Sequence, residues 1–105
     1  MITLPVQIPQ QAIAAFCMRS HIRKLSLFGS VLTERFRDES DIDILVEFEP
    51  GHVPGLIELA GMEIELSEIV GRKVDLRTAG ELSRNFRDKV VASAVPQYES
   101  RDIER

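Results

Sequence analysis

The sequence predicts an α+β fold, in which one small mixed β-sheet carries helices on one face and leaves the other face open and acidic. Helix-like and strand-like segments alternate along the 105 residues. The later strand-like segments each have one apolar and one charged face, and a sheet covered by helices on one side satisfies that pattern. The length suits a single domain, residues 1–105, with one modest core.

The composition is that of an ordinary globular protein, with 44% hydrophobic and 29% charged residues. No apolar run approaches the roughly 20 residues of a membrane span, and the N-terminus lacks the basic and apolar regions of a secretory signal. Cys17 is the single cysteine and cannot form an internal disulfide. We therefore expect a cytoplasmic protein without a membrane partner.

The net charge of −4 is unevenly distributed. Between Asp38 and Gly71 there are ten acidic residues and no basic one, whereas Arg72 to Lys89 contains six basic and three acidic residues. An acidic middle suits a metal ion or a basic partner. It opposes non-specific binding to duplex nucleic acid, which needs positive charge facing phosphate, so no direct nucleic-acid binding is expected.

The first half of the chain begins with an extended lead-in and a helix from Gln10 to about Ser20. Cys17 lies on the apolar stripe of this helix and is predicted to be a core residue. His21 is close to the helix end, where capping is the expected role. The first strand is predicted at Lys24–Phe28, followed by a short helix or turn over residues 30–37.

The second strand is predicted from Asp41 to Glu49, where apolar and acidic residues alternate and only Leu45 breaks the pattern. A turn at residues 49–52 ends this strand. The clearest helix follows over residues 54–70, with Gly71 as its C-terminal cap. Its predicted apolar stripe comprises Leu56, Leu59, Ala60, Met62, Leu66, Ile69 and Val70.

The third strand is predicted at Lys73–Arg77, with Val74 and Leu76 on the face opposite Asp75. A turn over residues 78–81 leads into a helix over residues 82–94, which Pro96 ends. Residues 97–105 fit a frayed helix or a short edge strand equally well.

Three aspartates are the candidate metal ligands and catalytic residues. Asp41 and Asp43 occupy alternate positions of one strand, so they share a face with Cα atoms about 7 Å apart. Asp75 joins them if the second and third strands are neighbours. Three close carboxylates repel one another unless a cation binds. Mg²⁺ prefers oxygen ligands and leaves positions for phosphates, and two such ions can steady the oxygens of a phosphoryl displacement.

Gly29 and Ser30 are the candidate nucleotide-binding residues. A glycine at a strand-to-helix turn lets the backbone approach a phosphate, and the following amides point outward from the helix N-terminus. Ser30 adds a hydroxyl donor and suits a helix cap. A Gly-Ser turn followed after ten residues by Asp41 and then Asp43 is more specific than either motif alone. Together they predict a site for a nucleoside triphosphate and a divalent metal.

Structural interpretations of the same residues stay open. Asp41 and Asp43 also fit a solvated strand face, and Asp75, between Lys73 and Arg77, fits an ion-paired strand residue. A calcium loop of the EF-hand type is excluded because Val46 stands where such a loop needs glycine. Either a solvated face or contacts to a triphosphate would account for the basic residues that follow the acidic middle, Arg72, Lys73, Arg77 and Arg84.

Residues 25–75 resemble the minimal nucleotidyltransferases of the DNA polymerase beta superfamily. The resemblance is carried by Phe28-Gly29-Ser30 followed by Ser40-Asp41-Ile42-Asp43-Ile44-Leu45-Val46. It implies that Gly29-Ser30 holds the phosphates of ATP, that Asp41 and Asp43 bind two Mg²⁺ ions, and that Asp75 helps to activate the attacking hydroxyl. It also implies the antitoxin half of an MNT–HEPN toxin–antitoxin pair, which transfers AMP to a tyrosine of the partner toxin and releases pyrophosphate.

The sequence departs from this family where many relatives continue the Gly-Ser turn with Ala-Arg-Gly. Thr33 and Glu34 replace the usual Arg and Gly, and Arg35 or Arg37 is the candidate substitute cation. At this length we expect the acceptor to be brought by a partner protein or by a second copy of the chain. The competing hypothesis is an antitoxin that only binds a basic toxin surface and has little or no catalytic activity.

Overall fold

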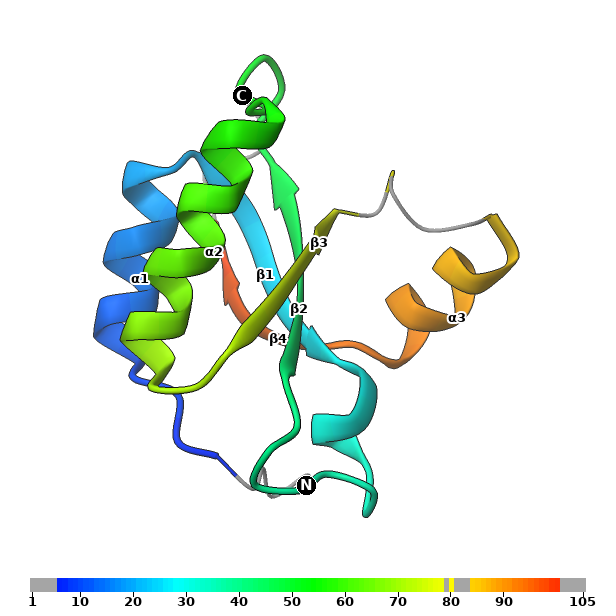
Figure 1. Cartoon of the computed structure of the whole chain (residues 1–105). Coiled ribbons are helices and arrows are strands. Elements are labelled where there is room, and N and C mark those ends of the chain that lie inside the picture. Colours follow the sequence, from blue (N-terminus) through cyan, green and yellow to red (C-terminus); the bar gives the residue numbers. More distant parts are fainter. Residues whose placement is uncertain (1–5, 79, 81–83, 101–105) are drawn as a thin grey trace.

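The computed structural model describes residues 6–78, 80 and 84–100, and in these ranges a mixed sheet has the strand order β3-β2-β1-β4. Strand β2 runs antiparallel to β1 and parallel to β3, and β4 pairs with the other edge of β1. The predicted mixed sheet is therefore confirmed (Figure 1). In chain order the elements are α1 Gln10–Arg19, β1 Ile22–Phe28, the 3₁₀ turn η1 Gly29–Leu32, β2 Ile42–Phe48, α2 Leu56–Val70, β3 Val74–Thr78, α3 Arg84–Ser93 and β4 Val95–Glu99.

The main hydrophobic core lies between the sheet and helices α1 and α2, which cover one face of it (Figure 1). The alternation of β2 sends Ile42, Ile44 and Val46 into this core, as predicted. Cys17 is fully buried there, which confirms its interpretation as a core residue. The other fully buried members are Ile13 and Phe16 of α1, Ile22, Leu25 and Leu27 of β1, Val31, Leu66 of α2 and Val74 of β3.

A second, smaller cluster lies on the opposite face of the sheet, where α3 packs (Figure 1). Leu45, the residue that breaks the alternation of β2, is only 3% exposed because Phe28 and Val90 cover it. Burying a leucine side chain stabilises a fold by about 1.5–3 kcal/mol. The predicted one-sided packing thus holds for α1 and α2, while α3 covers part of the acidic face.

The ends of several elements differ from the predicted ones. Strand β1 begins at Ile22, two residues earlier than predicted, and residues 95–99 form an edge strand. Gly71 caps α2 as predicted, with φ +80° and its N–H donating to the Ser67 carbonyl at 2.9 Å. Residues 79, 81–83 and 101–105, which include parts of the predicted turn, third helix and tail, lie outside the described residues.

The predicted apolar stripe of α2 is wrong at its N-terminal end. Leu59, Met62, Leu66, Ile69 and Val70 contact the core, but Leu56 is 80% exposed and Ala60 is exposed as well. Leu56 is the first residue of the helix, and it belongs to neither hydrophobic cluster. No helix in the described ranges combines the length and apolar character that crossing a membrane requires.

Candidate functional site

Asp43 and Asp75 lie side by side on the face of the sheet opposite α1 and α2. The parallel register of β2 and β3 pairs Asp43 with Asp75 directly, between the core pairs Ile42–Val74 and Ile44–Leu76. Neighbouring strands are about 4.8 Å apart, and paired residues point to the same face. The structure therefore brings together two of the three predicted carboxylates.

Gly29 lies against the Asp43 carboxylate at the end of β1. Its φ of +78° is in the left-handed region that favours glycine. A Cβ atom added at Gly29 would collide with Asp43 Oδ2 and approach its Cγ to 3.0 Å. Glycine is thus required here both by the backbone and by the space that the carboxylate occupies.

The backbone amide of Ser30 acts on the Asp43 carboxylate and lowers its pKa. The turn that follows β1 is a 3₁₀ helix, Gly29–Leu32, and no side-chain hydrogen bond caps it, so the predicted Ser30 cap is wrong. A turn of four residues offers few orphan amides, and the Ser30 amide is directed at the carboxylate. The Gly29-Ser30 turn therefore lies directly against Asp43, one of the metal-ligand candidates.

The pKa of Asp43 is raised above its ordinary value of 3.8. Burial is the main cause, and the neighbouring charge of Asp75 and the smaller effect of Asp41 act in the same direction. The Ser30 amide and the Arg77 guanidinium oppose the rise. Asp43 thus bears the repulsion of both other carboxylates, which a bound cation would relieve.

Asp41 and Asp75 each have a basic neighbour from β3 or the residue before it. Lys73 Nζ is 3.7 Å from Asp41 Oδ2, and Arg77 Nε is 3.2 Å from Asp75 Oδ1. The structure thus contains the ion pair that the structural interpretation of Asp75 expects. It also sets two cations beside the carboxylates, on the exposed face of the sheet.

The three aspartates suit a hard divalent cation by their chemistry. All of their ligand atoms are carboxylate oxygens, the type that Mg²⁺ prefers. Among the described residues, these oxygens are not all within 4.8 Å of one another. The side chains of Asp41 and Asp75 are 42% and 34% exposed, so both have room to turn from Lys73 and Arg77 toward a shared ion.

The departure at Thr33 has a local structural explanation. Thr33 Oγ1 donates to the Ser30 carbonyl at 3.0 Å and accepts from the Arg35 amide at 3.1 Å, which closes the turn after β1. The Arg37 guanidinium donates to the carbonyls of Glu34 and Phe36 at 2.9 and 3.2 Å. Arg37 is thus engaged within its own loop, and the cations that pair with Asp41 and Asp75 are Lys73 and Arg77.

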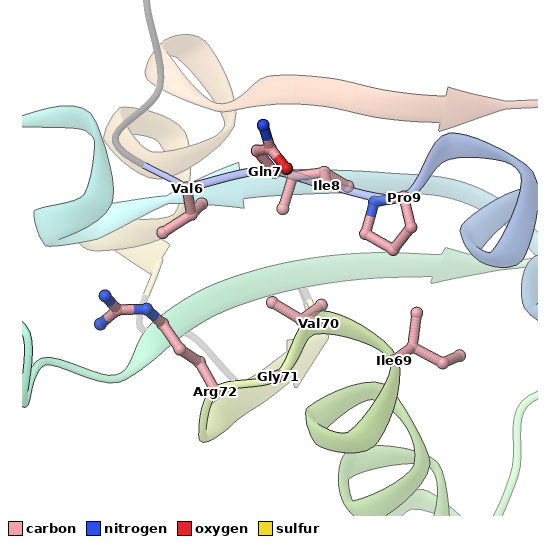
Figure 2. Close-up of a pocket in the computed structure, with 8 residues that line it drawn as sticks. All are labelled: Val6, Gln7, Ile8, Pro9, Ile69, Val70, Gly71 and Arg72. Carbon is pink, nitrogen blue, oxygen red and sulfur yellow. The ribbon is translucent and has the colours of Figure 1, made fainter.

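A cleft of about 720 Å³ lies elsewhere, between the N-terminal segment and the end of α2 (Figure 2). None of the five predicted site residues lines it. Its walls are formed by Val6, Gln7, Ile8, Pro9, Ile69, Val70, Gly71 and Arg72.

Comparison with known proteins gives matches along most of the chain. Residues 10–101 match the profile of the family described as a nucleotidyltransferase domain. A protein of Methanocaldococcus jannaschii named as a protein adenylyltransferase is 31% identical over 86 residues, which cover 82% of this chain and 90% of that protein. The protein adenylyltransferase MntA of Thermococcus cleftensis is 31% identical over 77 residues, or 73% and 76% of the two chains.

Solved structures share the fold. A structure described as a minimal nucleotidyltransferase superposes with a TM-score of 0.69 at 31% identity, covering 83% of this chain and 87% of that one. A crystal structure described as a toxin–antitoxin with AMP-PNP superposes with a TM-score of 0.71 at 20% identity, covering 89% and 75%. The second likeness is one of fold alone.

Proposed function

The chain belongs to the nucleotidyltransferase family, and from that premise we propose that it is a magnesium-dependent protein adenylyltransferase acting as an antitoxin. It transfers AMP from ATP to a hydroxyl, that of a tyrosine, on a partner toxin of the HEPN type. The observation that carries the proposal is the pairing of Asp43 with Asp75 beside the Gly29-Ser30 turn. The matched relatives named as protein adenylyltransferases support the same class of acceptor.

Each predicted residue has a role in this proposal. Asp41 and Asp43 hold the metal, and Asp75 orients the acceptor hydroxyl and takes its proton. Gly29 and Ser30 form the wall against which the phosphates lie. Magnesium bound by these carboxylates would neutralise charge on the triphosphate and favour pyrophosphate as a leaving group. The remaining catalysis comes from positioning, which is the main contribution in phosphoryl transfer.

The proposed reaction is one displacement at the α-phosphorus. The acceptor oxygen forms a bond to that phosphorus, and the bond between the phosphorus and the bridging oxygen breaks. Pyrophosphate leaves with the bonding electron pair, while the hydroxyl proton passes to an Asp75 oxygen. Asp75 is 34% exposed in its side chain, so an acceptor brought from outside has access to it.

Lys73 and Arg77 are proposed to provide the positive charge that Thr33 and Glu34 do not. Both are close to the carboxylates, at 3.7 Å and 3.2 Å from Asp41 and Asp75. Lys73 has a side chain that is 78% exposed, which leaves it free to reach a triphosphate. If Asp41 and Asp75 turned toward a bound metal, Lys73 and Arg77 would be available to phosphate oxygens.

The acceptor is proposed to arrive on a partner protein, because the site lies on an open face of the sheet. Solved neighbours described as toxin–antitoxin complexes, one of them with AMP-PNP, support this assignment. A cytoplasmic location is part of the proposal, and a second copy of the chain is the alternative carrier of the acceptor.

The test is incubation of the chain with α-³²P-labelled ATP, Mg²⁺ and the protein encoded by its neighbouring gene. The proposal expects label on the partner, loss of label with EDTA or Asp41→Asn, and loss of toxin neutralisation with the same variant. The matched control is Glu68→Gln, an exposed carboxylate on α2. Neutralisation that survives Asp41→Asn without any labelling would replace the enzyme with the binding-only antitoxin.

A further inference from the structure

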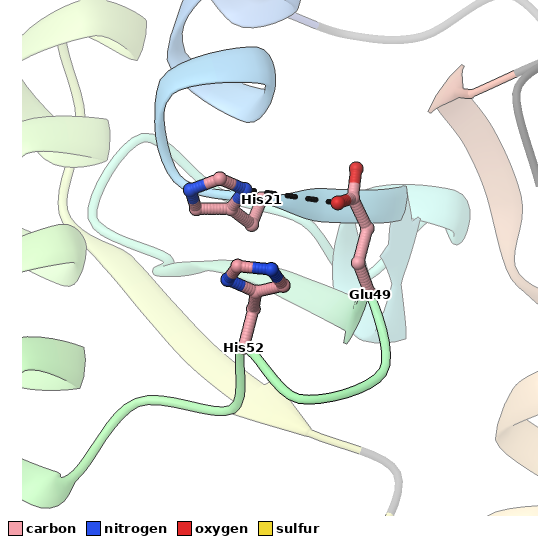
Figure 3. A group of neighbouring side chains, drawn as sticks. All are labelled: His21, Glu49 and His52. Atoms are coloured by element: carbon pink, nitrogen blue, oxygen red, sulfur yellow. Dashed lines mark ion pairs between the residues drawn. The ribbon is translucent and has the colours of Figure 1, made fainter.

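Two histidines and a glutamate gather at the opposite end of the β1–β2 pair from the aspartates (Figure 3). His21 precedes β1, whereas Glu49 and His52 follow β2. Each of the three residues offers one ligand atom, and these atoms lie within 4.8 Å of one another. The imidazole rings stack with centroids 3.9 Å apart, and His21 Nδ1 is 3.6 Å from Glu49 Oε1.

Backbone hydrogen bonds hold the three residues together. The Glu49 amide donates to the His21 carbonyl at 2.9 Å, and the His52 amide donates to the Glu49 carbonyl at 3.0 Å. The second bond closes a turn with Pro50 and Gly51 at its centre, and Gly51 has φ +83°. Proline followed by a glycine of positive φ is the pattern of a type II turn. Folding of the chain therefore fixes the ligand spacing.

His21 itself has an unusual backbone conformation. Its φ of +59° makes it the one residue other than glycine with positive φ in the described part of the chain. Glycine is the unstrained residue at such a position after a helix, and a histidine here directs its imidazole toward Glu49. The sequence predicts helix capping for His21 and a turn at residues 49–52, because nothing local in the sequence indicates that they meet.

The ligand set defines the class of ion. Imidazole nitrogen suits zinc and similar first-row transition metals, whereas Mg²⁺ and Ca²⁺ take oxygen ligands. Two ligands bound at about 2.0–2.1 Å in a tetrahedral site are about 3.3–3.4 Å apart, close to the 3.6 Å between His21 Nδ1 and Glu49 Oε1. Both rings are exposed, so they have room to turn their nitrogens edge-on to an ion.

We propose that His21, Glu49 and His52 form a binding site for Zn²⁺ or a closely related divalent transition metal, with the remaining coordination position open to water. The site is distinct from the proposed nucleotide site, since the seven residues of β1, Ile22–Phe28, lie between them and extend about 20 Å. An ion there ties the α1–β1 junction to the β2–α2 connection. Its role is to clip these two connections together.

The chain has only two histidines, which makes the test direct. We would titrate the tag-free, chelator-treated full-length chain with ZnCl₂ and follow both imidazoles by long-range ¹H–¹⁵N NMR, with isothermal titration calorimetry for stoichiometry. The expected result is that both histidines shift together and saturate at one Zn²⁺ per chain. Zn²⁺ that leaves either ring unchanged, or that binds only in the millimolar range, would overturn the proposal.

Variants separate this site from the aspartate site. His21→Gly suits the positive φ and so keeps the fold, yet it should weaken Zn²⁺ binding by at least about 10-fold. Asp41→Asn should leave the histidine shifts and the affinity unchanged, whether or not that variant transfers AMP. Zn²⁺ binding that resists His21→Gly, or that disappears in Asp41→Asn, would contradict the site.

Discussion

Asp43 and Asp75 are paired residue to residue across the parallel strands β2 and β3. The pairs on either side of them, Ile42–Val74 and Ile44–Leu76, are buried in the main core. Packing of these apolar residues therefore holds the two carboxylates together against their repulsion. Burial and, after it, the charge of Asp75 raise the pKa of Asp43.

Asp43→Asn should stabilise the protein while abolishing transfer. Because burial and Asp75 raise the pKa of Asp43, the folded chain binds this proton more tightly than the unfolded chain. The contribution of Asp43 to the free energy of unfolding should therefore increase as the pH falls through the folded-state pKa toward 3.8. The Asn variant has no titrating group at this position and should lack this pH dependence. Thermal unfolding at pH 7 and at pH 5, compared with AMP transfer, checks both effects. A variant less stable than the wild type at pH 7 would contradict this.

Gly29→Ala should lose activity as well as stability. The positive φ alone costs an alanine about 1–2 kcal/mol, and the added Cβ displaces the Asp43 carboxylate. Gly71→Ala is the matched control, since Gly71 has φ +80° but no atom within 4 Å of an added Cβ. Urea unfolding should show losses in both variants, whereas AMP transfer per folded molecule should fall only in Gly29→Ala. Equal AMP transfer per folded molecule by the two variants would mean that Gly29 is not part of the active site.

Arg77→Ala should shift the acid limb of the pH–rate profile to higher pH. Arg77 lowers the pKa of Asp43, so its removal raises that pKa further, and a higher pH is then needed to ionise the carboxylate. The variant should also raise KM for ATP if Arg77 contacts phosphate. Arg77→Lys keeps the charge and should restore most of the profile. An unchanged acid limb in Arg77→Ala would mean that the guanidinium does not act on Asp43 during catalysis.

Val90→Ala should destabilise the protein by about 1–3 kcal/mol, because Val90 is 5% exposed against Phe28 and Leu45. The next residue provides the control: Val91 is 46% exposed, and Val91→Ala should change the free energy of unfolding by less than about 0.5 kcal/mol. Chemical denaturation measures both. Similar losses of unfolding free energy in the two variants would mean that α3 does not pack Val90 against Phe28 and Leu45.

Cys17 should resist alkylation in the folded protein. Burial raises the pKa of its thiol to about 12, so almost no thiolate is present at neutral pH. Iodoacetamide should modify the chain only in denaturant, or slowly through transient opening, as intact mass spectrometry would show. Rapid native labelling would mean that α1 separates readily from the sheet.

Much of the fold was predictable because the strands have clear alternation. The pattern of β2 placed Ile42 and Ile44 in the core and Asp43 on the other face, and only Leu45 did not fit. Its burial depends on α3, which follows much later in the chain. The exposure of Leu56 likewise depends on which part of α2 packs against the sheet. Both are tertiary effects that local periodicity does not contain.

The sequence predicts that the three aspartates come together only if β2 and β3 are neighbours in the sheet. Their matching faces then put Asp75 on the same side of the sheet as Asp41 and Asp43, but faces alone do not decide that Asp75 pairs with Asp43. The effect of the Ser30 amide on the pKa of Asp43 was not predictable, since it depends on the conformation of the η1 turn. The meeting of His21 with Glu49 depends on a backbone contact between distant segments, which the sequence does not reveal.

The alternation of β2 also couples chemistry to folding. A one-residue shift of β2 relative to β3 would put a neighbouring isoleucine in the place of Asp43 and would turn the Asp43 carboxylate into the hydrophobic core. A partly folded form in which β2 and β3 pair in a different register therefore cannot have the proposed active site. Loss of activity on heating should coincide with global unfolding. The rate of AMP transfer then measures the fraction of a preparation that is folded.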